Sequence, residues 1–181
     1  MTSREHAHEL PDELEATLVS AGRRTDAERL VERLGELGWT VGVAESLTGG
    51  LVVSELIAVS GASAVVRGGV VAYATELKQR LLNVDAALLD AHGAVHPRVA
   101  RQMAEGVRDA LGPGGSAADV GIATTGIAGP DSPDGQPVGT VHIAVATALG
   151  VRTESVVLDG DRAQIRAEAT ARAIRLALDA L

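Results

Sequence analysis

The chain contains no cysteine and no phenylalanine, and Trp39 and Tyr73 are its only tryptophan and tyrosine. Without cysteine there is no disulfide framework, no thiolate metal site and no cysteine nucleophile. With so few aromatic side chains, the core must be built from Ala, Val, Leu and Ile, and the 21 glycines allow close backbone approaches. Lysine is almost as rare, because Lys78 is the single lysine among 16 Lys and Arg residues.

Signals for a nucleic-acid or membrane partner are also lacking. The net charge of −8 argues against a general nucleic-acid binder, which needs a basic face, although a local cluster of cations is still able to hold an anionic ligand. The first 15 residues are polar and acidic and carry no apolar export signal. The apolar stretch 141–151 is too short to span a bilayer. We therefore expect a cytoplasmic protein that binds neither nucleic acid nor membrane.

The length of 181 residues corresponds to about one domain. A hydrophobic content of 46% and a charged content of 22% are typical of a soluble globular protein. Residues 1–25 are predicted to form an N-terminal arm, and residues 26–181 to form the domain.

Helical and strand patterns alternate along most of this domain, and two consecutive strands follow near its end. Periodicity and stop signals predict helices at 26–37, 51–59, after Thr75, at 86–91, 97–111 and 161–181, and strands at 39–44, 68–74, 119–124, 140–148 and 152–158. The last two strands are expected to form a hairpin. This order predicts an α/β domain with a mixed sheet of about five strands and helices on both faces.

The segment Ala44-Glu45-Ser46-Leu47-Thr48-Gly49-Gly50 lies where a predicted strand ends and a helix begins. Helix N-termini attract anions and developing negative charge, and glycines let a ligand approach the backbone. An equally good interpretation is that Ser46 or Thr48 only caps the helix. The segment is neither a P-loop nor a G-x-S-x-G nucleophile elbow.

A second candidate is the segment 70–78, which brings the single tyrosine and the single lysine within five residues of each other. Arginine stays protonated in a protein, whereas a desolvated lysine is able to become a neutral base. A chain that uses arginine elsewhere therefore has a chemical reason to keep Lys78. The alternative is that one lysine survived by chance in an arginine-biased sequence.

A third candidate is the loop that includes Thr125 and Gly126, whose hydroxyl and amide groups are able to contact a ligand. His92 and His96 are interpreted as turn and cap residues, and no metal site is expected. Arg162 and Arg166 are most simply a solvated helix face, although Arg162 follows a strand-to-helix junction and is able to point into the same cleft.

Taken together, five segments resemble one family. These are AESLTGG (44–50), GGVVAYATELKQRLLNV (68–84), HGAV (92–95), TTGIAGP (124–130) and PVGTVHIAV (137–145). They are similar, in the same order, to the C-terminal domain of CinA-like proteins, the nicotinamide mononucleotide (NMN) amidohydrolases. The resemblance covers roughly residues 26–180 and implies a three-layer α/β/α sandwich. It also implies hydrolysis of the NMN carboxamide to nicotinate mononucleotide and ammonia, with no metal or organic cofactor.

The resemblance also implies roles for individual residues. Ser46 would be the nucleophile, Lys78 its general base, and Tyr73 would lie beside them. The substrate-binding residues would be Thr48, Gly49, Gly50, Thr125, Gly126 and Arg162. We further expect burial and the cation of Arg162 to lower the pKa of Lys78. Leu47 stands where the family frequently has cysteine, a change that we expect to be tolerated.

Two other functions stay open at this point. The same loops would also suit a non-enzymatic module that binds a nucleotide or a competence- or damage-related protein. They would suit an amidase for another nucleotide or sugar amide as well. A homo-oligomer is compatible with the Leu- and Val-rich composition.

Overall fold

The computed structural model describes residues 24–132 and 135–181. The predicted arm, residues 1–25, falls almost wholly outside this range. The elements are α2 (Asp26–Leu37), β1 (Val41–Glu45), α3 (Leu51–Ile57), η1 (Ala62–Ala64), β2 (Val66–Val71), α4 (Thr75–Leu82), α5 (Ala86–His92), α6 (Pro97–Leu111), η2 (Pro113–Gly115), β3 (Val120–Gly126), β4 (Thr140–Thr147), β5 (Gly150–Val157) and α7 (Arg162–Leu178). Within this range, no helix is long and apolar enough to cross a membrane.

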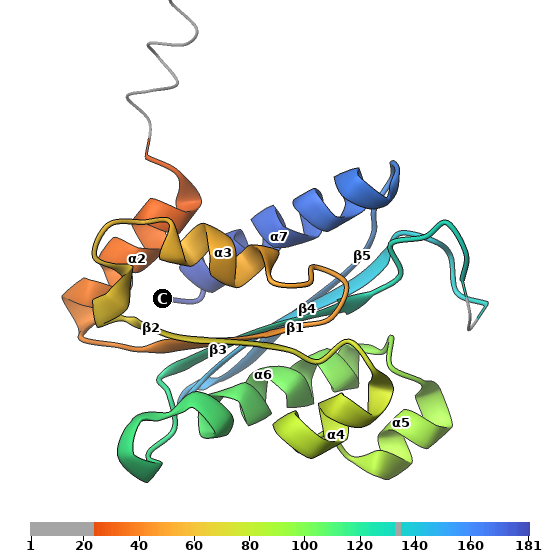
Figure 1. Cartoon of the computed structure of the whole chain (residues 1–181), viewed down its shortest axis with the longest axis horizontal. Coiled ribbons are helices and arrows are strands. Elements are labelled where there is room, and N and C mark those ends of the chain that lie inside the picture. The colour runs from red at the N-terminus through yellow and green to blue at the C-terminus, as the bar shows by residue number, and fades with distance from the viewer. Residues whose placement is uncertain (1–23, 133–134) are drawn as a thin grey trace, which may run out of the picture.

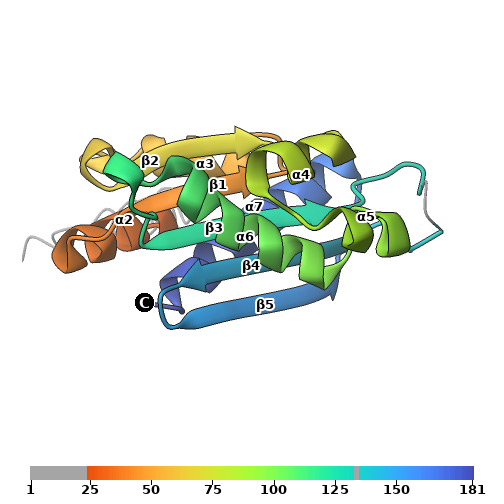
Figure 2. The same cartoon turned by 90° about the horizontal axis from the view of Figure 1, so that it is seen from below.

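The five strands form one mixed sheet in the order β2-β1-β3-β4-β5, seen face-on in Figure 2. β1 pairs in parallel with β2 and β3, whereas β4 is antiparallel to both β3 and β5. Helices α2, α3 and α7 cover one face, and α4, α5 and α6 cover the other (Figure 1). The predicted fold class, a three-layer α/β/α sandwich with a mixed five-stranded sheet, is therefore confirmed.

The two faces of the sheet carry side chains of different size, and neither face needs aromatic residues to fill its core. Larger aliphatic side chains such as Val43, Ile122 and Ile143 pack under α2, α3 and α7. On the α6 face the strands present mainly Ala and Gly, so α6 lies very close to the sheet. A Cβ added to Gly121 would come within 2.0 Å of the Ala104 carbonyl oxygen, so only glycine fits there.

Capping residues define several helix ends. Thr25 and Glu28 form a capping box on α2, Asp161 and Gln164 form one on α7, and the His96 side chain caps α6. The helix expected after Thr75 begins one residue earlier, because Thr75 is itself the first helical residue of α4 and Ala74 occupies the N-cap position.

Several predicted strand boundaries are displaced. β1 and β3 each end later than predicted, so Thr125 and Gly126 belong to a strand and not to a loop. β2 begins and ends earlier, which leaves Ala72 and Tyr73 in the connection to α4. The predicted hairpin of β4 and β5 is confirmed.

Candidate active site

The end of β1 is the topological switch point of the sheet. The chain leaves β1 through α3 on one face to reach β2, and then passes through α4, α5 and α6 on the other face to reach β3. In open α/β sheets, ligands bind in the crevice at such a point, outside the carboxyl ends of the strands. Ser46 directly follows β1, and its amide donates to the Thr124 carbonyl oxygen at 3.1 Å. Its side chain therefore lies at this crevice and is only 8% exposed.

The amine of Lys78 reaches Ser46 from the first turns of α4. Its Nζ atom lies 3.1 Å from Ser46 Oγ, 2.7 Å from the Ala72 carbonyl oxygen and 3.3 Å from the Tyr73 carbonyl oxygen. Lys78 is 1% exposed, so these three neutral acceptors replace water around the amine. The structure thus brings together the two residues that the sequence analysis expected to react, 32 positions apart in the chain.

The environment of Lys78 favours its neutral form. Burial lowers the pKa of Lys78 from 10.5 to about 8, and the carboxylate of Glu76 partly opposes this shift. The prediction that the Arg162 cation lowers the pKa of Lys78 is wrong. The charged neighbour that influences this pKa is the carboxylate of Glu76, which raises it. At pH 7, about one lysine in ten would be neutral, which suffices for a general base.

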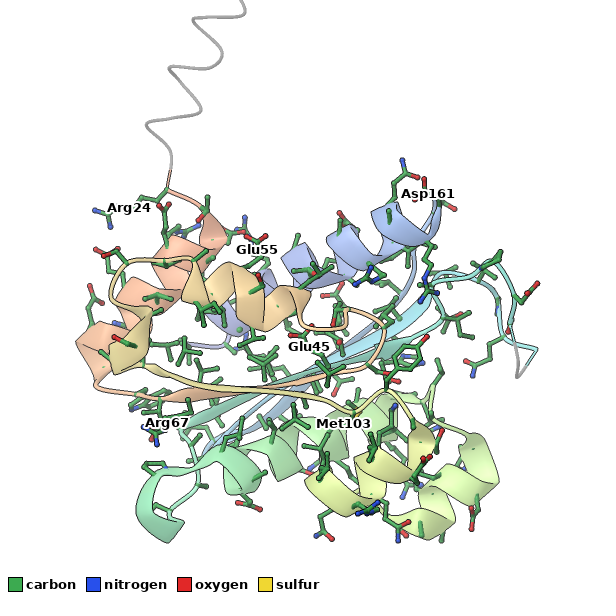
Figure 3. The ribbon with its side chains drawn as sticks, viewed as in Figure 1. Arg24, Glu45, Glu55, Arg67, Met103 and Asp161 are labelled. Carbon is green, nitrogen blue, oxygen red and sulfur yellow. The ribbon has the colours of Figure 1, made fainter. Side chains whose placement is uncertain are left out.

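Glu45 is the last residue of β1, and its side chain lies at the N-terminal end of α3, on the opposite face of the sheet from Lys78 (Figure 3). Its carboxylate is fully buried and accepts hydrogen bonds from the amides of Gly50 (2.8 Å), Val52 (3.2 Å) and Val53 (2.9 Å). Neither Ser46 nor Thr48 caps this helix, so that interpretation of the segment is wrong. The role of Glu45 was not foreseen, although a single acidic residue at the end of a buried-type strand was a visible signal.

A cavity of about 200 Å³ opens beside the Ser46 and Lys78 side chains. Residues from five segments that are distant in the sequence line it: Ser46, Leu47, Tyr73, Lys78, Ala94, Val95, Thr125, Gly126, Ile127, Ala128, Gly129, Asp131 and Arg162. Small-molecule pockets commonly measure about 300–1,000 Å³. The cavity is therefore suited to the reacting end of a substrate, whose remainder would extend past its mouth.

Arg162 and Tyr73 lie side by side at the mouth of the cavity. Arg162 donates from Nη1 to the Gly129 carbonyl oxygen at 2.8 Å, and its Nη2 lies 3.4 Å from the Tyr73 hydroxyl. Since β5 ends at the same edge of the sheet as β1, the first residue of α7 is delivered to this cavity. Arg162 is exposed to solvent, as a solvated helix face requires, but it also lines the cavity, which agrees with the alternative interpretation.

Thr125 and Gly126 also line the cavity, but the hydroxyl of Thr125 is engaged with protein. It donates to the Ala94 carbonyl oxygen at 2.8 Å, and so fixes the connection between α5 and α6 as one wall. The Gln136 side chain donates to the Val95 carbonyl oxygen in the same connection. The segment HGAV (92–95) belongs to the motifs that carry the family resemblance, but no role was predicted for it.

Three expected substrate-binding residues do not line the cavity. Thr48 is fully buried, and its hydroxyl lies 2.7 Å from that of Thr124. The amide of Gly50 is already bonded to Glu45, and Gly49 packs beneath the Arg166 guanidinium. These residues shape the turn after Ser46 and are absent from the cavity lining.

The histidines near this edge have structural contacts. The rings of His92 and His96 stack with centroids 4.6 Å apart, and His96 Nδ1 accepts from the Arg98 amide, as expected of turn and cap residues. His142 Nδ1 lies 2.8 Å from Ser155 Oγ. In residues 24–132 and 135–181, no group of three or more His, Cys, Asp or Glu side chains is arranged to hold a metal ion.

This geometry defines a class: a three-layer α/β/α protein with a serine–lysine pair in a cavity at the sheet's switch point. A family model described as the CinA C-terminal domain matches residues 23–181. A CinA-like protein from Frankia casuarinae is 52% identical over 137 residues, which cover 76% of this chain and 30% of that protein. One from Anaeromyxobacter dehalogenans is 51% identical, over 81% of this chain and 35% of that protein.

Solved structures agree with these sequence matches. A CinA superfamily protein from Escherichia coli superposes with a TM-score of 0.81 at 31% identity, covering 86% of this chain and 88% of that one. The competence/damage inducible protein CihA from Agrobacterium tumefaciens gives 0.75 at 36% identity, covering 86% and 97%. The chain belongs to the CinA C-terminal domain family. It spans about a third of the length of the curated relatives named above.

Proposed function

We propose that this protein hydrolyses the carboxamide of NMN to nicotinate mononucleotide and ammonia, with Ser46 as nucleophile and Lys78 as general base. The observation that carries the proposal is the 3.1 Å contact between Lys78 Nζ and Ser46 Oγ inside a cavity. An activated serine nucleophile requires an adjacent general base, and the buried amine of Lys78 lies where it can act as one.

The hydrogen bonds of Lys78 suit a neutral amine. A neutral amine has two N–H groups and one lone pair, and the Ala72 and Tyr73 carbonyl oxygens can take both N–H groups. The lone pair is then available to accept the Ser46 hydroxyl proton. The hydroxyl of Tyr73 lies next to Arg162, so the proton passes from serine to lysine directly and needs no relay through tyrosine.

The reaction proceeds in two balanced halves. Ser46 Oγ attacks the carboxamide carbon while Lys78 takes its proton; the C–N bond then breaks, and the lysine returns the proton to the leaving ammonia. Water next attacks the serine ester and loses a proton to Lys78; the C–Oγ bond then breaks, Lys78 returns that proton to Ser46 Oγ, and the acid product leaves. The amide of Leu47, which follows the nucleophile and whose residue lines the cavity, has no acceptor within the described part of the chain. It is our candidate donor to the oxyanion.

The charges around the cavity complement the two charges of NMN. Arg162, always protonated, lies at the mouth, where the 5′-phosphate of a nucleotide would extend. Asp131 is the acidic side chain in the cavity lining, and it suits the positive charge of the pyridinium ring. A neutral amide without a phosphate would use neither residue.

The direct test is release of ammonia from NMN by the purified protein, with nicotinate mononucleotide identified by chromatography. The Ser46→Ala variant is the matched control, because it removes one oxygen and leaves Lys78 in place. We expect turnover by the wild type and loss of turnover in the variant. A wild type that binds NMN without releasing ammonia would favour the non-enzymatic nucleotide-binding module, and turnover of other amides only would favour a different amidase.

A further inference from the structure

Arg166 lies on α7 one turn after Arg162, and its side chain holds the turn that follows Ser46. Its Nε donates to the Leu47 carbonyl oxygen and its Nη2 to the Thr48 carbonyl oxygen, both at 2.9 Å. The guanidinium is planar, so two simultaneous bonds fix the direction of both carbonyls and not only their distance. A Cβ added to Gly49 would meet Arg166 Nη2 at 3.3 Å, which shows how closely the turn packs against it.

The two bonds set the orientation of two successive peptide planes. In a planar trans peptide, the carbonyl and the following N–H point in opposite directions. Because the Leu47 and Thr48 carbonyls point toward α7, the amides of Thr48 and Gly49 point away from it. Neither amide has a hydrogen-bond acceptor elsewhere in residues 24–132 or 135–181. The Thr48 carbonyl also accepts from the Leu51 amide at 3.3 Å, and Arg166 is the side chain that reaches both carbonyls, so it contributes much of what orients this part of the turn.

The turn is also held at its two ends, by the Ser46 amide on the Thr124 carbonyl and by the Gly50 amide on Glu45. Between these ends lie the residues that set the direction of the Ser46 side chain and of the amide after it. We infer that Arg166 is a positioning residue, which keeps Ser46 Oγ aimed at Lys78 by fixing the Leu47 and Thr48 carbonyls. The inference rests on the proposed function, because this aim matters only where Ser46 acts as a nucleophile.

The test measures Ser46 reactivity without using NMN. A fluorophosphonate reacts when the serine oxygen displaces fluoride from phosphorus, and mass spectrometry locates the adduct. We expect Arg166→Met to label Ser46 about 10- to 100-fold more slowly than the wild type, the penalty typical of a small misplacement of a reacting group. Arg172→Met is the matched control: Arg172 is on the same helix but pairs with Glu154 and Glu168, and its loss should leave the labelling rate unchanged.

Two further readouts separate positioning from a purely structural role. Arg166 touches backbone carbonyls and not Lys78, so the midpoint of the labelling rate against pH should stay the same in Arg166→Met. With NMN, kcat should fall by the same factor as labelling while KM changes less than about twofold. If Arg166→Met does not fold, Arg166→Lys serves, since an ammonium lacks the planar two-point geometry and should give an intermediate rate.

The outcomes of these experiments separate the positioning role of Arg166 from the proposed function. Equal labelling of the wild type and a folded Arg166 variant, or a shifted pH midpoint, overturns the positioning role and leaves the proposed function intact. Slowed labelling in a protein that does not hydrolyse NMN supports the positioning role and rejects the substrate. A wild type whose Ser46 is not labelled overturns both the activated serine and the role of Arg166.

Discussion

Two ionisable side chains are buried on opposite faces of the sheet where β1 ends, and their surroundings differ. Glu45, toward α3, accepts three backbone N–H groups that have no partner within their own helix. Lys78, on the α4 side, contacts two carbonyls and one hydroxyl, and burial lowers its pKa to about 8. The Glu45 carboxylate is surrounded by N–H donors, whereas the Lys78 amine is held where burial penalises its charged form.

The comparison distinguishes a buried ionisable group that holds the structure, Glu45, from one that is placed to react, Lys78. Donors that match a carboxylate allow it to fix a turn and a helix end. An amine whose partners are all neutral is ready to exchange a proton, and the group that it contacts is a hydroxyl beside a cavity. At the end of β1, Glu45 therefore holds the turn on one face of the sheet, and Ser46 meets Lys78 on the other.

The largest expected effect follows from removing the amine. Lys78→Met keeps an unbranched apolar side chain in the buried site but has no base, so NMN hydrolysis should fall about 10³-fold, within the range for a general base. Steady-state ammonia release measures this, with circular dichroism as the folding control. A folded variant with near-wild-type turnover would show that Lys78 is buried for structural reasons, as Glu45 is.

The second prediction concerns the stability cost of the buried amine. The Lys78 pKa is lower in the folded protein than in the unfolded chain, so between about pH 8 and 10.5 the unfolded chain binds the extra proton. Stability of the wild type relative to Lys78→Met should therefore rise with pH across this window, by up to about 3 kcal/mol. Urea unfolding at several pH values measures it, and a difference that does not change with pH would remove the contrast with Glu45.

A smaller loss of stability is expected when the carboxylate is neutralised. Glu45→Gln places an NH₂ group among three amide donors and loses charge-assisted hydrogen bonds, which should cost about 2 kcal/mol of unfolding free energy. The pH midpoint of Ser46 labelling should not move, because Glu45 faces the other side of the sheet. Urea unfolding and the labelling profile test the two statements, and a displaced midpoint would link the two buried groups.

The smallest effect is expected at the cavity wall. Asp131→Asn removes a negative charge from an exposed side chain and should raise the KM for NMN about threefold with little change in kcat, as partly screened charges contribute modestly. Initial rates over a range of NMN concentrations measure both constants. An unchanged KM would remove Asp131 from the recognition of the pyridinium charge.

Much of the architecture was predictable because it depends on local patterns. The α6 helix begins at Pro97 after its His96 cap, and the hairpin of β4 and β5 follows from two apolar runs around a short turn. The displaced ends of β1 and β3 were harder to locate, since Glu45, Thr124 and Thr125 are polar residues within buried strands. Their burial depends on partners that arrive from other segments.

The candidate site was predictable to a similar extent. Ser46, Lys78 and Arg162 are conspicuous in the sequence, as one serine in a glycine-rich turn, the single lysine and one arginine after a strand, and their expected roles came from the family resemblance. Arg166 was assigned to a solvated face because its acceptors are backbone carbonyls 118 and 119 positions away, which no side-chain pattern reveals. The acid that opposes the lowering of the Lys78 pKa, Glu76, is only two residues away and was visible in the sequence, but the strength of its effect depends on the distance that the fold sets.

The most direct test of the account is the titration of Lys78 itself. Because the chain has a single lysine, protein labelled with ¹³C-lysine gives one Cε signal that reports this amine alone. The account predicts a titration midpoint near pH 8 in the folded protein, and an altered chemical shift in the Ser46→Ala variant. A midpoint at about 10 or above, the value of a solvated lysine, would contradict it.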